Sequence, residues 1–255
     1  MNTIFVGDIH LKSRAILPLI DKIIESYNVN KVIFLGDYTD FPGQEHNIQL
    51  YVKDLIYLSE WKENALKNNI EAINLIGNHD IYYYLGTKAE FSIKDEDVFW
   101  AIGDFLEELS LQVAYQLDDI IISHAGYNQY FNPEPWHFKP LTLENSKALE
   151  QLANTIGPLR GGSSKGGSPV WADYNELISQ PNKNIKKQIV GHTPTKCIDI
   201  SKDIISVDTF AVDNQLRLFG NGDVLYYNKC NKFQVINTNW KSEKILVSLE
   251  QLIYS

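Results

Sequence analysis

Short apolar runs alternate with longer amphipathic segments in the first half of the chain. Thr3–Val6, Val32–Leu35 and Ala72–Ile76 are mostly apolar runs of strand length, and a glycine follows each of them. Between them, Ser13–Tyr27 and Asn47–Asn68 carry apolar side chains at helical spacing, with Ser13 as the predicted N-cap of the first helix. This order of strands and helices predicts parallel strands joined by right-handed crossovers, and therefore an α/β fold.

The later pattern predicts further strands and helices. A helix is expected over Glu96–Leu109, and the strands Gln112–Leu117 and Ile120–Ser123 are expected to pair. The remaining expected elements are a helix near Leu143–Ile156, strands over Gln188–Val190, Ile204–Val207, Leu216–Phe219, Val224–Tyr227 and Phe233–Ile236, and a helix over Glu243–Ile253. Asn221-Gly222 predicts a hairpin between two of these strands. We expect one domain over residues 1–255, with a second, mostly antiparallel sheet and an irregular segment at 126–186.

Composition excludes several classes of function. The chain has 23 basic and 32 acidic residues, a net charge of −9, which disfavours duplex nucleic acid and anionic membranes as partners. No apolar run reaches the roughly 18 residues of a membrane span, and the first residues do not resemble a signal peptide. Cys197 and Cys230 fit neither a disulfide framework nor a zinc motif, so we expect both to be small core residues of a cytoplasmic protein.

Possible metal ligands follow five of the expected strands. The loops read GDIH (7–10), GDYTD (36–40), GNHD (77–80), SHAG (123–126) and GHTP (191–194), and they contain four of the 6 histidines. Functional side chains of an α/β sheet gather outside the carboxyl ends of its strands, so the five loops are expected to converge on one rim. Carboxylate, amide and imidazole donors suit divalent ions such as manganese, iron or zinc. The pattern therefore predicts a metal site.

This series of motifs resembles that of the calcineurin-like metallophosphoesterase superfamily, from Asp8 to His192. The resemblance implies a four-layer α/β/β/α sandwich with mixed sheets and a dinuclear metal site at the strand ends, covered by the segment 126–186. It also implies a metal-dependent phosphoesterase that uses two divalent ions, manganese first, with iron, zinc, nickel or cobalt as alternatives. Carried over by motif, the ligands are Asp8, His10 and Asp37 for one ion, and Asp37, Asn78, His124 and His192 for the other.

Two features resemble the phosphoprotein phosphatase branch, which includes the symmetrical dinucleoside tetraphosphatases. Asp40 stands three residues after Asp37, and Pro194 replaces a histidine common in other branches. The chain departs from this branch at Leu11, where a glycine is usual, and at Phe41, where an arginine normally holds the substrate phosphate. We therefore expect other residues to bind that phosphate: Arg160 first, Arg14 as the alternative, and Asn78 beside them.

The same resemblance assigns roles in catalysis. His79 is expected to protonate the leaving group as general acid, and Asp40 to hold the other nitrogen of its ring. Asp80 is the alternative partner of His79, but it is rather expected to be a solvated turn carboxylate. Trp171 is expected either to line the substrate cleft or to lie in the core.

Several functions remain open. The leading expectation is a phosphomonoesterase of the protein Ser/Thr phosphatase type, whose substrate is a phosphorylated protein or a small phosphorylated molecule. The alternatives are a dinucleoside polyphosphate hydrolase, a nuclease or cyclic phosphodiesterase and, least favoured, a catalytically silent binding module.

Overall fold

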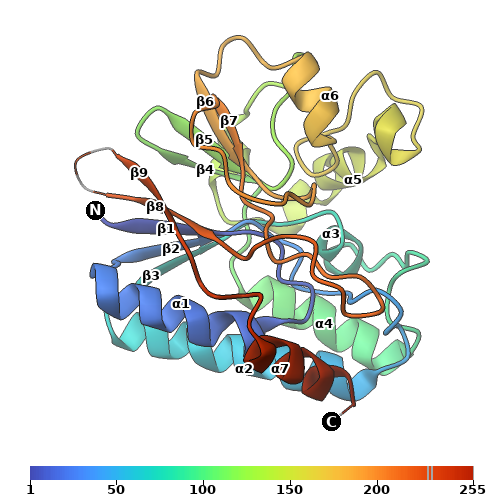
Figure 1. Ribbon diagram of the computed structural model, residues 1–255. Helices are drawn as coiled ribbons and strands as arrows, with labels where there is room; N and C mark the ends of the chain where they lie inside the picture. Colours follow the sequence, from blue (N-terminus) through green and yellow to red (C-terminus); the bar gives the residue numbers. More distant parts are fainter. Residues whose placement is uncertain (229, 231, 255) are drawn as a thin grey trace.

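Two mixed sheets and seven α-helices make up the computed structural model, which describes residues 1–228, 230 and 232–254 (Figure 1). The first sheet has the order β3-β2-β1-β8-β9. Its strands are β1 (Thr3–Val6), β2 (Lys31–Phe34), β3 (Glu71–Asn74), β8 (Val224–Tyr227) and β9 (Phe233–Ile236). β1, β2 and β3 are parallel, as expected, while β8 and β9 join antiparallel to the same sheet.

The second sheet has the order β4-β5-β6-β7. Its strands are β4 (Ala114–Leu117), β5 (Ile120–Ser123), β6 (Lys187–Val190) and β7 (Ile204–Ser206). In this sheet β4 and β5 pair antiparallel, whereas β5, β6 and β7 run parallel to one another. The expectation of a mostly antiparallel second sheet is therefore wrong: the hairpin β8–β9 extends the first sheet instead.

The helices cover the outer faces of the two sheets (Figure 1). On the side of the first sheet lie α1 (Ser13–Tyr27), α2 (Ile48–Lys67), α4 (Glu96–Glu108) and α7 (Glu243–Tyr254). On the side of the second sheet lie α5 (Ser146–Asn154) and α6 (Tyr174–Ser179), while the short α3 (Asp80–Tyr84) follows a motif loop. Short 3₁₀ turns occur at Pro135–Phe138, Leu143–Asn145 and Pro158–Arg160. No helix in the described part of the chain is both long and apolar enough to cross a membrane.

The continuous apolar runs are explained by burial on both faces of the strands. In β1, Ile4 and Val6 belong to the core under the helices, whereas Phe5 belongs to the core between the sheets. The inter-sheet core also contains Ile122 from β5 and Ile189 from β6. Strands buried on both faces lose the polar alternation of an exposed strand, so they are recognisable as apolar runs.

Two expectations in the last third of the chain and one at the cysteines need revision. Residues 216–219 form no strand: Leu216 has a left-handed φ of 60°, which interrupts an extended run, and only one bridge joins Val212 to Leu218. Asn221-Gly222 is therefore not a hairpin turn, and Gly222 instead donates its backbone N–H to the Thr209 carbonyl. The two cysteines are exposed rather than buried in the core.

Candidate metal centre

The five motif loops meet where the two sheets face each other, so the donors come from both sheets rather than from one. Several motif residues have left-handed backbones, with φ of 45° at His10, 51° at Asp37 and 63° at His192. Such conformations are uncommon for residues with side chains, and they concentrate at functional sites. The loops after β1, β2 and β6 thus turn sharply at the residues that carry the donors.

Two glycines allow the loops after β2 and β3 to touch. A Cβ at Gly36 would lie 2.5 Å from the backbone nitrogen of Gly77, and a Cβ at Gly77 would lie 2.0 Å from Asp37 Oδ1. Neither contact is possible for a real side chain. Glycine at these positions therefore sets how closely the GDYTD and GNHD loops approach, and with it the position of Asp37.

Asp37 lies at the centre of the cluster. Its Oδ2 is 3.5 Å from His10 Nε2 and 3.5 Å from His124 Nε2, while its Oδ1 accepts the backbone N–H of His79 at 2.9 Å. Ligands that share one ion at about 2.0–2.2 Å lie roughly 3.0–3.4 Å apart. The two separations are close to that range, so one carboxylate oxygen can lie between two ions.

The two imidazoles are oriented by backbone carbonyls. Nδ1 of His10 donates toward the carbonyl oxygens of Thr39, at 3.0 Å, and Asp40, at 2.8 Å. Nδ1 of His124 donates to the Leu35 carbonyl at 2.8 Å. These bonds place the protons on Nδ1 and leave both Nε2 lone pairs directed at Asp37, which is how metal-binding histidines are usually held.

His124 Nε2 has two further possible ligands beside it. Asn78 Oδ1 lies at 3.0 Å and His192 Nδ1 at 3.2 Å. Asp37, His124 and His192 form one buried group of donors, and His10, Asp37 and His79 form a second, with the donor atoms of each group within 4.8 Å of one another. The second group differs from the expected set, because it includes His79 in place of Asp8.

Asp8 is nevertheless part of the cluster. Its Oδ2 lies 3.9 Å from His10 Nε2, and its Oδ1 accepts the backbone N–H of His192 at 3.0 Å. The latter bond joins the loop after β1 to the loop after β6, and so connects the two sheets at the site.

The electrostatics of the cluster favour a bound cation. Burial, and then the neighbouring charge of Asp8, raises the pKa of Asp37 well above its usual value, and burial raises the pKa of Asp8 to about 6. Burial lowers the pKa of His124 to about 3 and that of His192 well below its ordinary value. The imidazoles are neutral and have lone pairs available, and they lie next to carboxylates that repel each other. A divalent ion can bind these lone pairs and offset the repulsion between the carboxylates. The residues present therefore fit the metals that the resemblance implies.

The expected dyad of His79 and Asp40 is present. Nδ1 of His79 lies 3.0 Å from Asp40 Oδ2, and the His79 side chain is 23% exposed. Its Nε2 thus remains available at the edge of the cluster, while the carboxylate fixes the orientation of the ring.

Asp80 is not the solvated turn carboxylate that we expected. It is fully buried, and its Oδ2 accepts the backbone N–H groups of Asp37 at 2.7 Å and Gly77 at 3.0 Å. Its Oδ1 accepts the backbone N–H groups of Tyr38 at 2.9 Å and Thr39 at 3.3 Å. Asp80 therefore joins the GDYTD and GNHD loops through their backbone N–H groups.

The two candidate phosphate-binding arginines lie in different places. Arg160 donates from Nη2 to Thr193 Oγ1 at 2.7 Å and to the His192 carbonyl at 3.3 Å, and its charge contributes to the lowered pKa values of His124 and His192. Arg14 instead pairs with Asp54, whose carboxylate lies 3.6 Å from Arg14 Nε. The same carboxylate accepts the first N–H groups of α1, so Asp54 takes the capping role that we had expected of Ser13.

The segment 126–186 reaches the cluster through Arg160 and Trp171. The Trp171 ring is half-buried and packs edge-on against His192, with centroids 5.7 Å apart. Arg160 Nε also lies 3.1 Å from Asp173 Oδ2. These contacts place one side of the irregular segment against the loop after β6.

Two buried charges behind the cluster were not anticipated. Lys12 is 1% exposed, and its ammonium lies 5.6 Å from the ring centroid of Phe41, the position where the phosphatase branch has its arginine. Asp208 is buried, and burial and the charge of Asp8 raise its pKa well above the usual range. Asp208 follows the apolar run of β7 as the other donors follow theirs, and this signal could have revealed it.

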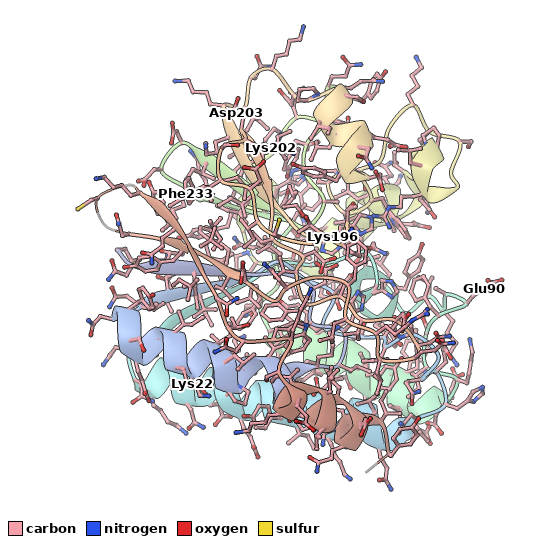
Figure 2. The ribbon with its side chains drawn as sticks, viewed as in Figure 1. Lys22, Glu90, Lys196, Lys202, Asp203 and Phe233 are labelled. Atoms are coloured by element: carbon pink, nitrogen blue, oxygen red, sulfur yellow. The ribbon has the colours of Figure 1, made fainter. Side chains whose placement is uncertain are left out.

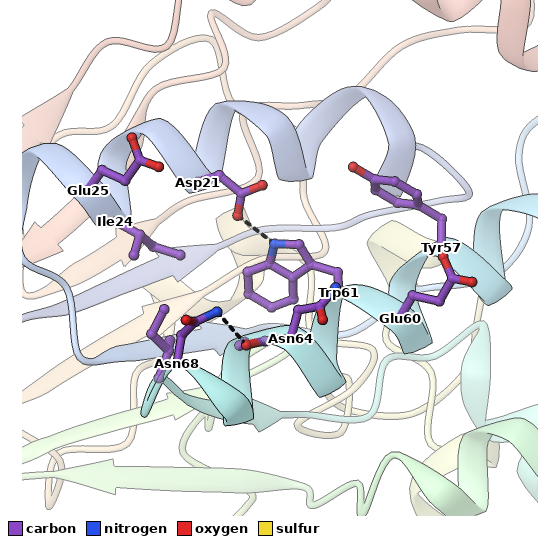
Figure 3. Close-up of a pocket in the computed structure, with 10 residues that line it drawn as sticks. Asp21, Ile24, Glu25, Tyr57, Glu60, Trp61, Asn64 and Asn68 are labelled. Carbon is purple, nitrogen blue, oxygen red and sulfur yellow. Dashed lines mark hydrogen bonds between the residues drawn. The ribbon is translucent and has the colours of Figure 1, made fainter.

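A separate pocket of about 540 Å³ lies between α1 and α2 and contains none of the motif residues (Figure 3). Trp61 Nε1 donates across it to Asp21 Oδ1 at 2.6 Å. Its lining carries the acidic side chains of Asp21, Glu25 and Glu60. The bond between the indole and Asp21 joins the two helices, so we interpret this pocket as part of the helix packing.

The similarities to known proteins agree with this geometry. A protein tyrosine phosphatase of the psychrophile Shewanella sp. has 18% sequence identity and a TM-score of 0.59, over 93% of this chain and 78% of that one. At that identity the likeness concerns the fold alone. A serine/threonine phosphatase from Saccharomyces cerevisiae (15% identity, TM-score 0.49, 93% and 80% covered) and a putative diadenosine tetraphosphatase (14%, 0.41, 92% and 93%) are more distant, and no argument rests on them. No curated protein matches the chain.

The family profile described as calcineurin-like phosphoesterase matches residues 1–196. That stretch covers most of the chain and all five motif loops. With the two mixed sheets and the donor cluster between them, it shows that the chain belongs to the calcineurin-like phosphoesterase family and is a metal-dependent phosphoesterase.

Proposed function

We propose that the chain hydrolyses phosphomonoesters with two divalent metal ions, manganese first, and that its substrate is a phosphoserine or phosphothreonine protein. The observation that carries the proposal is the position of Asp37 Oδ2, 3.5 Å from both His10 Nε2 and His124 Nε2. A single carboxylate oxygen between two oriented imidazoles is suited to bridge two ions.

The proposed ligands follow from this arrangement. Asp8, His10 and Asp37 would hold one ion, and Asp37, Asn78, His124 and His192 would hold the other. When bound, the ions would supply a water of lowered pKa as the nucleophile and positive charge for the phosphoryl oxygens. By distance His79 belongs to the second donor group, and we leave it out of the ligands because its Nε2 is the atom proposed to serve the leaving group.

The other residues act on the phosphate and the leaving group. Arg160 binds the phosphate with the part of its guanidinium that does not contact Thr193, His192 and Asp173, and Asn78 contacts the phosphate as well. Arg14 is the weaker candidate, because its guanidinium contacts Asp54, whereas that of Arg160 contacts Thr193 and the carbonyl of His192 at the cluster. As an imidazolium, His79 donates its Nε2 proton to the leaving alkoxide and becomes neutral, while its Nδ1–H stays hydrogen-bonded to Asp40, which orients the ring. The segment 126–186 covers one side of the cleft.

Charge and motif chemistry favour a monoester over nucleic acid. The net charge of −9 opposes binding of a polyanion, and Pro194 removes one histidine that diesterases and nucleases of the superfamily carry. A dinucleoside polyphosphate remains the principal rival, since its phosphates would meet the same ions and the same arginine.

A substrate panel with added manganese tests the proposal. It compares a phosphopeptide, p-nitrophenyl phosphate, bis-p-nitrophenyl phosphate, diadenosine tetraphosphate and single-stranded DNA. We expect the phosphopeptide and the monoester to be hydrolysed faster than the others. Faster hydrolysis of the diester would reverse the assignment, and no metal-dependent hydrolysis of any substrate would favour a silent binding module.

A further inference from the structure

Asp40 accepts hydrogen bonds from two tyrosines as well as from His79. Its Oδ1 accepts the hydroxyl of Tyr51, from α2, at 2.7 Å and the hydroxyl of Tyr83, from α3, at 2.5 Å. Its Oδ2 faces His79 Nδ1 at 3.0 Å. Both tyrosines are buried, with exposures of 0% and 1%. One carboxylate oxygen is thus occupied by hydroxyl groups, and only the other is left for the imidazole.

Tyr83 also holds the loop that packs against the face of His79. Its hydroxyl accepts the backbone N–H of Ile93 at 2.8 Å, and the Phe91 ring lies 4.0 Å from the His79 ring, centroid to centroid. Glu90, the neighbour of Phe91, points outward from the molecule (Figure 2). The loop therefore turns its aromatic side chain inward, onto the histidine, and its charged side chain outward.

We propose that Tyr51 and Tyr83 are positioning residues for the leaving-group step: they fix the Asp40 carboxylate so that His79 presents its Nε2 to the leaving oxygen. The inference rests on the proposed role of His79 as general acid. Neither tyrosine touches substrate in this scheme, and both act through Asp40.

The physical reason is that a carboxylate with only one oxygen hydrogen-bonded is free to rotate. Without the hydroxyls, Asp40 could rotate about its terminal bond and offer His79 either oxygen at varied angles, and the imidazole would follow. Burial and the negative charge of Asp40 raise the pKa of both tyrosines, so the hydroxyls stay protonated and remain donors. Tyr83 uses its hydrogen to donate and a lone pair to accept, so phenylalanine would break both contacts at once.

Leaving-group dependence tests the inference with Tyr51→Phe and Tyr83→Phe. Each variant is measured with manganese on 2,4-dinitrophenyl phosphate, which needs little protonation of its leaving group, and on phenyl phosphate, which needs a general acid. General acids contribute about 10²–10⁴-fold, so a displaced one should reduce kcat on phenyl phosphate about tenfold and on the dinitrophenyl ester less than about twofold. A smaller fraction of folded protein would lower both rates by the same factor, so the ratio of the two rates would not change.

Two matched controls lie on the same helices. Tyr57→Phe on α2 and Tyr84→Phe on α3 remove the same atom from side chains that are only partly buried. Both should keep the wild-type ratio of the two rates. In addition, Tyr83→Phe combined with His79→Asn should behave like His79→Asn alone, because the tyrosine acts only through the histidine.

The outcomes separate this inference from the proposed function. If His79→Asn lowers the phenyl phosphate rate selectively while the tyrosine variants keep the wild-type ratio, the tyrosine inference is overturned and the role of His79 stands. If His79→Asn also keeps the ratio, the general-acid assignment fails and the inference fails with it. An equal loss on both substrates in the tyrosine variants would show a purely structural role and overturn the inference.

Discussion

Replacing Asp80 by asparagine should destabilise the protein strongly, although the side chain keeps its size and shape. The carboxylate accepts four backbone N–H groups with its two oxygens, from Asp37, Gly77, Tyr38 and Thr39. An amide has one acceptor oxygen, so at least two of these buried N–H groups lose their partner. Each unsatisfied buried donor costs about 1–3 kcal/mol, which predicts a loss of about 4 kcal/mol in the free energy of unfolding. For a chain of this size that corresponds to a fall in Tm of about 10 °C.

Thermal and urea unfolding at about pH 8 would measure the effect, since burial raises the pKa of Asp80 to about 6 and the group is ionised there. Asp104→Asn is the matched control, because this aspartate is exposed on α4 and its change should alter stability by less than about 0.5 kcal/mol. Manganese binding should weaken in parallel, because Asp80 holds the backbone of Asp37. An Asp80→Asn protein that melts within about 2 °C of the wild type would refute the reasoning.

Three further predictions follow from the geometry of the site. Gly77→Ala places a Cβ 2.0 Å from Asp37 Oδ1, so equilibrium dialysis should show manganese affinity about 100-fold weaker. Gly161→Ala is the control: it adds the strain of a left-handed backbone (φ 82°), but its Cβ meets no atom within 4 Å, so it should bind manganese normally. Burial raises the pKa of Asp8 to about 6, so protons compete with the metal below that pH, and calorimetry should find affinity about tenfold lower at pH 5 than at pH 7; a pH-independent affinity would contradict this. Arg160→Lys should reduce kcat/KM for a phosphomonoester about tenfold because lysine cannot form paired N–H bonds, while Arg14→Lys should leave it unchanged; the opposite result would exchange their roles.

The first half of the fold could be predicted from the sequence largely because β1 and β2 are buried on both faces. Such strands are continuous apolar runs, and the glycine after each run marks the loop that carries a donor. The last third was harder, since Leu216 and Leu218 alternate with polar residues as in a strand, yet Leu216 has a left-handed backbone and only Leu218 forms a bridge. Alternation alone does not show whether a neighbouring strand is present.

For the site, motif spacing predicted that these side chains would come together but not what surrounds them. His10, Asp37 and His124 approach one another as expected, whereas the burial of Asp80 depends on how closely two glycine loops pack, which a single sequence does not show. The contacts of Tyr51 with Asp40 have the same origin, because α2 and the GDYTD loop meet only in the tertiary structure.

The donors of the cluster divide between the two sheets: Asp8, Asp37 and Asn78 follow strands of the first, and His124 and His192 follow strands of the second. Ions bound there would link the two sheets, and the free energy of metal binding would stabilise the packing of one sheet against the other. The loaded protein should then unfold in one cooperative transition. Chelation would leave only the apolar core between the sheets and the Asp8–His192 hydrogen bond to join the layers, so the layer built on β4-β5-β6-β7 should open more easily than in the loaded protein.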